Sequence, residues 1–180
     1  MADGGMTIDM EGLQEAVQKL DPELYAGPLR QFFTKAAVIL QGAARANAME
    51  RWHDTGQTAN SIVYEVDDAT PPQYAKIGLL NADEGSPLWY KARAGEYGTG
   101  RMGDSSVPHE SGHWPPGDAL DVWAGRHGFS SGGAVAAAIG RRGGIVPRRY
   151  LRDAMQQSVG QINELIGSLI SYIGDKWSKQ

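Results

Sequence analysis

The chain carries one string of residues that could hold a metal ion, His109-Glu110-Ser111-Gly112-His113. In zinc hydrolases with the pattern H-E-x-x-H, a helix places the two histidines one turn apart on the metal, and the glutamate activates water. Here Pro108 precedes the string, Gly112 lies inside it, and two prolines follow Trp114, so a helix is not expected. A zinc hydrolase built on this string is therefore a remote alternative, and we expect no metal and no catalytic residues.

A second string, Gly98-Thr99-Gly100-Arg101-Met102-Gly103, matches the nucleotide-binding pattern G-x-G-x-x-G. That pattern works only after a strand and at the start of a helix, where backbone N–H groups meet the pyrophosphate. The residues that follow it, Asp104-Ser105-Ser106-Val107-Pro108, do not favour a helix. We therefore expect no bound dinucleotide and no other cofactor.

Arginine is concentrated in one part of the chain. Five arginines fall within twelve residues, at Arg141, Arg142, Arg148, Arg149 and Arg152. They could pair with acidic groups of this chain or of a neighbouring copy, or they could contact phosphate. The whole chain has 17 basic and 21 acidic residues, a net charge of −4, so bulk attraction to DNA or to an anionic membrane is not expected.

Length and composition limit the class of protein. A chain of 180 residues suits one domain, and we expect a single domain over residues 1–180. The absence of cysteine excludes disulfides and thiolate metal sites. No apolar run approaches the roughly 20 residues of a membrane span, and the first residues lack the features of a signal peptide. The composition favours a protein made and used in the cytoplasm, or in something assembled there.

Apolar periodicity predicts two long helices. One is expected to start near Pro28 and to end near Met49. The other is expected to start at Pro147 and to carry one apolar face made of Leu151, Met155, Val159, Ile162, Ile166, Leu169, Ile173 and Trp177. On this last helix Gly160, Gly167 and Gly174 recur every seven residues. Either a neighbouring backbone approaches this glycine stripe closely, or the stripe faces solvent.

The segment between the long helices should be mixed in structure. Alternating β-branched and aromatic residues predict strands at 61–66 and 74–80, while 88–97 fits either a helix or a strand. Glycine and proline make regular structure scarce over 98–117. Two short helices should follow, the first capped by Asp118 and the second by Ser130 or Ser131, ending at Gly128 and Gly143. The second helix is rich in glycine and alanine, which indicates packing rather than the reading of DNA bases.

Three short stretches in a fixed order carry a resemblance to a known family. They are T-G-x-x-x-x-S-I at Thr55, Gly56, Ser61 and Ile62; E-x-G-T at Glu96, Gly98 and Thr99; and P-x-x-Y-L-x-x-A-M at Pro147, Tyr150, Leu151, Ala154 and Met155. Together with the flanking helices, this order resembles the tail-completion, or head–tail joining, family of minor tail proteins of long-tailed double-stranded DNA bacteriophages. Compared with the shortest members, residues 101–145 form an insertion.

The resemblance implies an α+β fold. A small, mostly antiparallel sheet would be packed by a long N-terminal helix and a long amphipathic C-terminal helix, and the loop-rich insertion would carry the short helix pair. It also implies a structural virion protein without catalysis, cofactor or metal: one subunit of a hexameric ring in the neck or at the head-proximal end of the tail, assembled in the host cytoplasm.

The resemblance also implies partners. These would be other copies of the chain, tail tube or terminator proteins, and head connector or stopper proteins; DNA would pass nearby without sequence-specific binding, and no membrane is involved. Glu96 is expected to accept backbone N–H groups at the turn that follows it, or to pair with an arginine across a subunit boundary. The five arginines and the glycine stripe are candidate subunit contacts. The second interpretation is a DNA-contacting packaging or morphogenesis factor that uses the Arg141–Arg152 cluster.

Overall fold

The structure is a computed structural model of the chain, and it describes residues 6–7, 22–52, 55–106 and 115–177. The chain divides into two compact units. The first unit comprises Met1–Asn47, Ala59–Asn81 and Leu151–Gln180, and the second comprises Ala48–Thr58 and Ala82–Tyr150. The expectation of a single domain stays a prediction.

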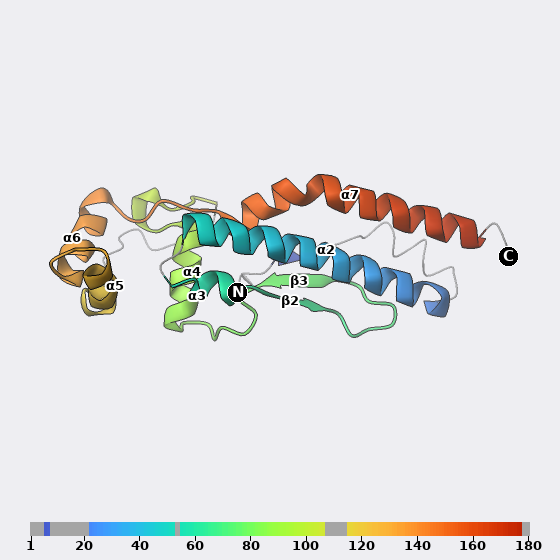
Figure 1. The fold of residues 1–180 in the computed structure, drawn as a ribbon, viewed down its shortest axis with the longest axis horizontal. Helices are drawn as coiled ribbons and strands as arrows, with labels where there is room; N and C mark the ends of the chain where they lie inside the picture. The colour runs from blue at the N-terminus through green and yellow to red at the C-terminus, as the bar shows by residue number, and fades with distance from the viewer. Residues whose placement is uncertain (1–5, 8–21, 53–54, 107–114, 178–180) are drawn as a thin grey trace. The chain divides into compact units, whose positions relative to one another are not determined.

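The long helix α2 (Pro22–Arg51) runs through the first unit (Figure 1). Its apolar residues recur at helical spacing and fill the core, as the sequence predicts from Leu29 onward: Leu29, Phe32, Phe33, Ala36, Ala37, Leu40 and Ala44 are all buried. Tyr25, which lies before the predicted start, is buried as well. The predicted start near Pro28 is wrong, because Pro28 lies inside the helix. An interior proline destabilises a helix by about 3 kcal/mol. The burial of Tyr25 and Leu29 on either side of Pro28 offsets that loss.

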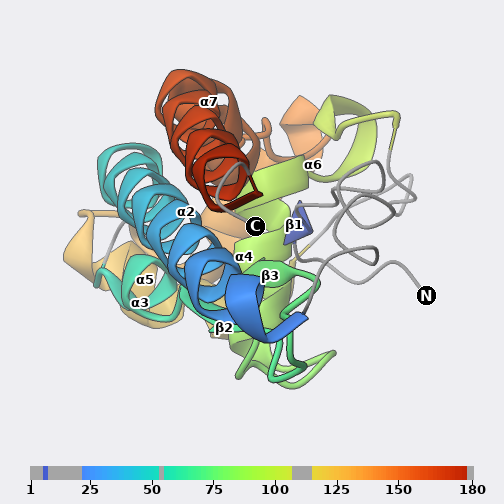
Figure 2. The ribbon, with the colours of Figure 1, turned by 90° about the vertical axis from the view of Figure 1, so that its right-hand side faces the viewer.

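A small antiparallel sheet lies along α2 (Figures 1 and 2). Its strands are β1 (Met6–Thr7), β2 (Val63–Val66) and β3 (Ala75–Gly78), in the order β1-β3-β2. The register pairs Tyr64 with Ile77, and Ile77 also pairs with Met6. The sequence prediction of two strands is confirmed, although both are shorter than expected. The sequence also predicts one helical face made of Ile8, Leu13, Val17 and Leu20, and these residues lie outside the described part of the chain.

The last helix, α7 (Tyr150–Trp177), packs with α2 and completes the first unit from residue 151 onward (Figure 2). One side-chain hydrogen bond links the two helices, from Asn47 Nδ2 to Gln157 Oε1 at 3.2 Å. The predicted apolar face is partly wrong, since Val159 is 45% exposed while the small residues Ala154 and Ser158 are buried. Small side chains on the buried arc let two helix backbones approach each other closely.

The second unit is built from short helices. They are α4 (Pro87–Tyr97), the 3₁₀ turns η1 (Gly100–Met102) and η2 (Asp118–Leu120), α5 (Asp121–Arg126) and α6 (Gly132–Arg142). The short helix α3 (Gln57–Asn60) follows Gly56 and lies at the boundary of the two units along the chain. The α+β fold expected from the resemblance is therefore present, with its short helix pair at α5 and α6.

Local capping signals explain where several of these helices begin and end. Ser86 caps α4 by accepting a hydrogen bond from Trp89 N–H at 3.2 Å, and Pro87 takes the first helical position. Ser131 caps α6 in the same way, and Gly143 ends it at a positive φ of 86°. The predicted Asp118 cap is wrong: Asp118 is the first residue of η2, which has no side-chain cap.

Candidate functional site

Two of the three stretches that carry the resemblance meet in the second unit. Thr99 N–H donates to the Ile145 carbonyl at 2.9 Å, and Ile145 N–H donates back to Thr99 Oγ1 at 3.0 Å. Farther from this contact along both segments, Arg148 N–H donates to the Gly95 carbonyl at 2.7 Å. We call this structure the motif crossing, defined as residues 95–100 together with residues 143–150.

Glycine is required where the two segments touch. A Cβ atom on Gly144 would fall on the carbonyl oxygen of Thr99, and one on Gly100 would fall on the carbonyl oxygen of Gly143. Both glycines have positive φ, +130° and +59°, a region that side chains disfavour. These clashes are with backbone atoms, which cannot swing aside. The G-x-G-x-x-G string therefore contributes to a chain crossing, with helix α4 before it and the turn η1 inside it.

Pro147 lies in the motif crossing rather than at the start of a helix. A Cβ atom on Gly98 would lie 2.7 Å from Pro147 Cδ, so the proline ring packs directly against that glycine. The helix α7 begins three residues later, at Tyr150. The prediction that Pro147 opens the helix is wrong because residues 145 to 149 are held extended or turned by their bonds to the end of α4.

Glu96 and Tyr150 are both buried in this region, at 3% and 1% exposed. Tyr150 Oη donates to the Ala92 carbonyl at 2.8 Å. Burial, and then the charges of Glu96 and Tyr97, raise the pKa of the Tyr150 phenol well above its usual value. The phenol therefore stays protonated and serves as a hydrogen-bond donor that fastens the start of α7 to α4.

The predicted role of the Glu96 carboxylate as an anchor for the turn after it stays a prediction, although two backbone N–H groups of that turn bond to other acceptors. Gly98 N–H donates to the Ala94 carbonyl, and Thr99 N–H goes to Ile145. Glu96 lies in the last turn of α4, and its own carbonyl accepts from Arg149 N–H at 3.3 Å. The alternative, in which Glu96 pairs with an arginine across a subunit boundary, stays a prediction.

The first stretch is divided between the two units. Thr55 Oγ1 accepts from Gln57 N–H at 3.4 Å, and Gly56 has a φ of 72°, so both make the turn that the sequence predicts. In the first unit, Ser61 lies in a turn and Ile62 is fully buried. The Ile62 carbonyl accepts three hydrogen bonds, from Gln41 Nε2 at 2.9 Å and from Arg45 Nε and Nη2 at 3.0 and 2.8 Å.

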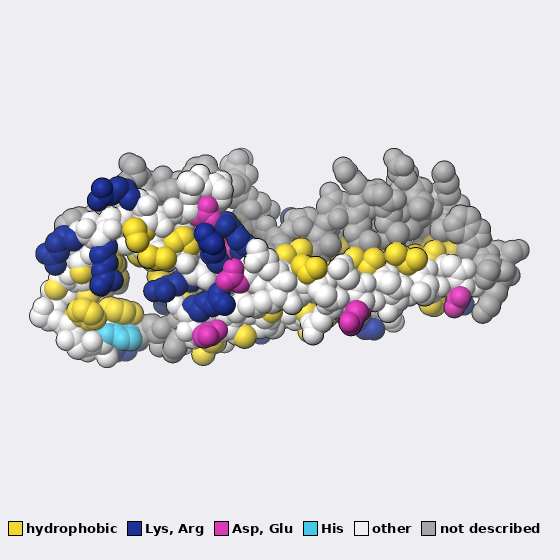
Figure 3. Space-filling view, turned by 90° about the horizontal axis from the view of Figure 1, so that it is seen from above, with side chains coloured by type: hydrophobic (Ala, Val, Ile, Leu, Met, Phe, Trp, Pro, Cys, Tyr) yellow, Lys and Arg dark blue, Asp and Glu magenta, His cyan; other side chains and the backbone are white. Residues whose placement is uncertain are grey.

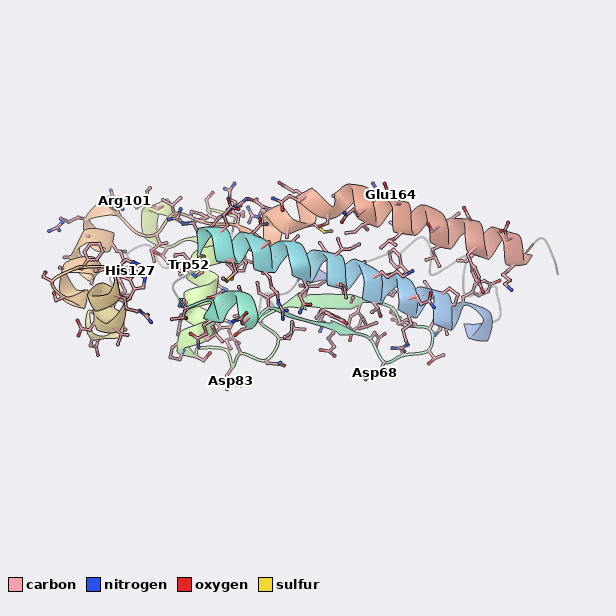
Figure 4. The ribbon with its side chains drawn as sticks, in the orientation of Figure 1. Trp52, Asp68, Asp83, Arg101, His127 and Glu164 are labelled. Carbon is pink, nitrogen blue, oxygen red and sulfur yellow. The ribbon has the colours of Figure 1, made fainter. Side chains whose placement is uncertain are left out.

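Trp52 connects the end of α2 to α4 within the second unit (Figure 4). A Cβ atom on Gly95 would lie 2.6 Å from the indole Nε1 of Trp52, so the ring lies flat against the glycine backbone. Sequence reasoning missed this contact. The sequence did offer one indication: Gly95 lies inside a helix, where glycine is unfavourable unless a neighbouring side chain packs against it.

Four arginines of the predicted cluster lie in the second unit and are exposed. Arg141, Arg142, Arg148 and Arg149 form no ion pair with any part of the chain that the structure describes. Arg101 shares these properties and lies beside the loop that follows α6 (Figure 4). The last arginine of the predicted cluster, Arg152, belongs to the first unit, is half-buried and has an interaction partner. Within the second unit, the exposed arginines therefore include the other four together with Arg101.

The turn between α5 and α6 presents an aromatic cluster, which we call the aromatic tip: Trp123, His127 and Phe129. The Trp123 ring stacks on His127 at a centroid distance of 4.2 Å and on Phe129 at 5.5 Å. Phe129 is 48% exposed, and the neighbouring Val122 is 72% exposed. Figure 3 shows a histidine side chain in cyan beside hydrophobic side chains in yellow, with arginine and lysine side chains in dark blue on the same face. Sequence reasoning placed the helix pair correctly but missed this surface.

The glycine stripe of α7 faces solvent. Gly160, Gly167 and Gly174 are exposed, and a Cβ atom on any of them would have no atom within 4 Å. Nothing in the described part of the chain requires glycine at these positions. The hypothesis that a neighbouring subunit approaches there stays a prediction.

The zinc-like string His109–His113 lies outside the described residues. Within the described part of the chain, no three histidine or acidic side chains gather as metal ligands. In that same part, no helix has the length and hydropathy of a membrane span. No family model, curated protein sequence or solved structure matches the chain.

Proposed function

We propose that this chain is a structural virion protein: a tail-completion or head–tail connector subunit that forms a hexameric ring at the head-proximal end of a long phage tail. The motif crossing supports this proposal. The resemblance rests on Glu96, Gly98, Thr99, Pro147 and Tyr150, and in the structure these residues fasten backbone to backbone. These residues therefore have a structural role, as expected in a subunit of a virion.

The aromatic tip supports assembly with other proteins. Single exposed apolar side chains are normal on any protein surface, but contiguous exposed patches mark interaction sites. Tryptophan also dominates the binding energy of many interfaces. Val122 and Phe129 are the most exposed apolar residues of this hairpin, and Trp123 is stacked between two other rings. We assign the tip as a contact with another ring subunit or with a tail or connector protein.

Light scattering coupled to size-exclusion chromatography, followed by electron microscopy, tests the proposal. The purified chain should form rings, either alone or after addition of tail tube or connector protein. A double variant, Val122→Ser with Phe129→Ser, should remain folded but assemble less readily, while Val38→Ser, which removes a 49%-exposed apolar side chain in the first unit, serves as the control. A chain that stays monomeric at every concentration and with every such partner would refute the proposal.

The second candidate function is a DNA-contacting packaging or morphogenesis factor. One observation favours it: four of the five clustered arginines are exposed and lack ion pairs within the described residues. Salt-sensitive binding of DNA by the isolated chain would support this candidate. The remote zinc alternative would require stoichiometric, tightly held zinc in the purified protein.

A further inference from the structure

We propose that five exposed arginines around the motif crossing form one surface that binds the phosphate backbone of double-stranded DNA without reading its sequence. We call them the arginine patch: Arg101, Arg141, Arg142, Arg148 and Arg149. This inference deepens the second candidate function by naming the ligand and the residues. It does not require that the chain form a ring.

The motif crossing joins the chain segments that carry the patch. Arg101 lies on the segment after α4, yet its Nε is 3.2 Å from the position that a Cβ atom on Gly143 would take. Gly143 directly follows Arg142, so the Arg101 guanidinium lies beside the end of α6. The Arg148–Arg149 pair follows Ile145 along the chain, and its backbone is bonded to Gly95 and Glu96, the residues before Thr99.

Hydrogen bonds to the end of α4 hold the backbone of Arg148 and Arg149 in place. Arg148 N–H donates to the Gly95 carbonyl at 2.7 Å, and Arg149 N–H donates to the Glu96 carbonyl at 3.3 Å. Arg149 has a φ of 53° and is the one non-glycine residue at positive φ in the described part of the chain. Residues held in such disfavoured conformations concentrate at functional sites. Pre-positioned side chains lose less freedom when they bind a ligand.

The charge around the patch favours an anionic ligand. From residue 122 to residue 150 the sequence has no aspartate or glutamate and five arginines, which are Arg126 and four members of the patch. The chain as a whole is acidic, at −4, so its positive charge is concentrated here. Guanidinium groups bind phosphate oxygens through paired N–H donors and remain charged at every relevant pH.

The composition of the patch favours a nucleic-acid backbone over a protein partner. A protein interface is expected to have an apolar or aromatic centre. Between the two arginine pairs, Val146 is the one large apolar side chain that is strongly exposed, at 49%. Asparagine and glutamine, the side chains that pair with adenine, are missing from residues 141–149. Contacts of this kind position DNA and carry no sequence information.

The expected binding is weak and steeply dependent on salt. Each phosphate neutralised on duplex DNA contributes about −0.9 to the slope of log K against log salt. Five contacts set an upper limit of about −4.5 for the slope, which corresponds to a loss of about 500-fold in affinity between 50 and 200 mM salt. Two unrelated duplexes of equal length should bind equally well.

The test is fluorescence anisotropy with a dye-labelled 20-base-pair duplex and the full-length chain, over a range of salt concentrations. The double variants Arg141→Gln with Arg142→Gln, and Arg148→Gln with Arg149→Gln, should each weaken binding and make the slope shallower by up to about 1.8. The control, Lys35→Gln with Lys176→Gln, removes the same charge from exposed positions in the first unit and should change the slope little.

A further variant separates binding from folding. Arg149→Gly relieves the positive φ, so it should raise the melting temperature while it weakens DNA binding. No binding at 25 mM salt, or equal slopes for patch and control variants, would overturn the proposal. Equal competition by polyglutamate at matched charge would also overturn it and would point to an acidic protein segment. Ring formation is measured separately by light scattering, so a failure of the proposed ring is distinguished from a failure of the proposed DNA binding.

Discussion

Replacing Gly144 by alanine should destabilise the second unit. The added Cβ atom would fall on the Thr99 carbonyl oxygen and lie 2.6 Å from the Thr99 carbonyl carbon, and Gly144 has a φ of +130°. A disfavoured φ costs an alanine about 1–2 kcal/mol, and forcing extra atoms into a packed site costs about 1–3 kcal/mol more. The total is about 2–5 kcal/mol, which for a chain of this length lowers the melting temperature by about 4–20 °C.

Tryptophan fluorescence is the assay for this substitution. Four of the five tryptophans belong to the second unit, so fluorescence reports mainly on its unfolding, while far-ultraviolet circular dichroism reports on both units. The matched control is Gly167→Ala in α7, where a Cβ atom meets nothing within 4 Å. Because alanine favours a helix over glycine, this control should stabilise the chain by up to about 1 kcal/mol. A Gly144→Ala variant as stable as wild type would refute the described packing of the motif crossing.

Three further predictions concern hydrogen bonding and exposed surface. Burial raises the pKa of Tyr150, so its phenol stays protonated above pH 10 while the same phenol ionises in the unfolded chain. The free energy of unfolding of the wild type should therefore fall by about 1 kcal/mol between pH 10 and 11, and that of Tyr150→Phe should not show this fall; urea unfolding at each pH measures both. Arg45→Met removes two donors from the Ile62 carbonyl and should lower the free energy of unfolding by about 1–2 kcal/mol in urea titrations. Val122→Ser with Phe129→Ser should change the stability of the isolated chain by only about 0.5 kcal/mol per site in thermal melts, because both side chains are exposed. A large loss there would show that the tip packs within the chain.

Sequence reasoning succeeded where the signal is local. Ser131 and Gly143 mark the ends of α6, because a serine side chain and a left-handed glycine satisfy backbone groups within one turn of their own positions. The apolar spacing of α2 likewise predicts its buried face, because one long helix against a sheet and a second helix needs a continuous stripe. The strands were found from their alternation.

Sequence reasoning failed where contacts between distant segments decide the structure. Pro147 has the preference of a first helical residue, but its segment is bonded to the end of α4, so α7 begins at Tyr150. The buried face of α7 includes the small residues Ala154 and Ser158, and the prediction from large apolar residues left both out. The arginine patch depends on Arg101 reaching Gly143, some 42 positions along the chain. A single sequence predicts turns at glycines such as Gly100, Gly143 and Gly144, but it does not tell which two segments of the chain cross there.

Cryo-electron microscopy of the purified phage particle tests the central proposal most directly. The account predicts a ring of copies of this chain around the tail axis at the head-proximal end of the tail, with density that fits the α2–α7 helix pair and its three-stranded sheet. Particles that lack the chain, or that carry it as a single copy away from the head–tail junction, would contradict the account.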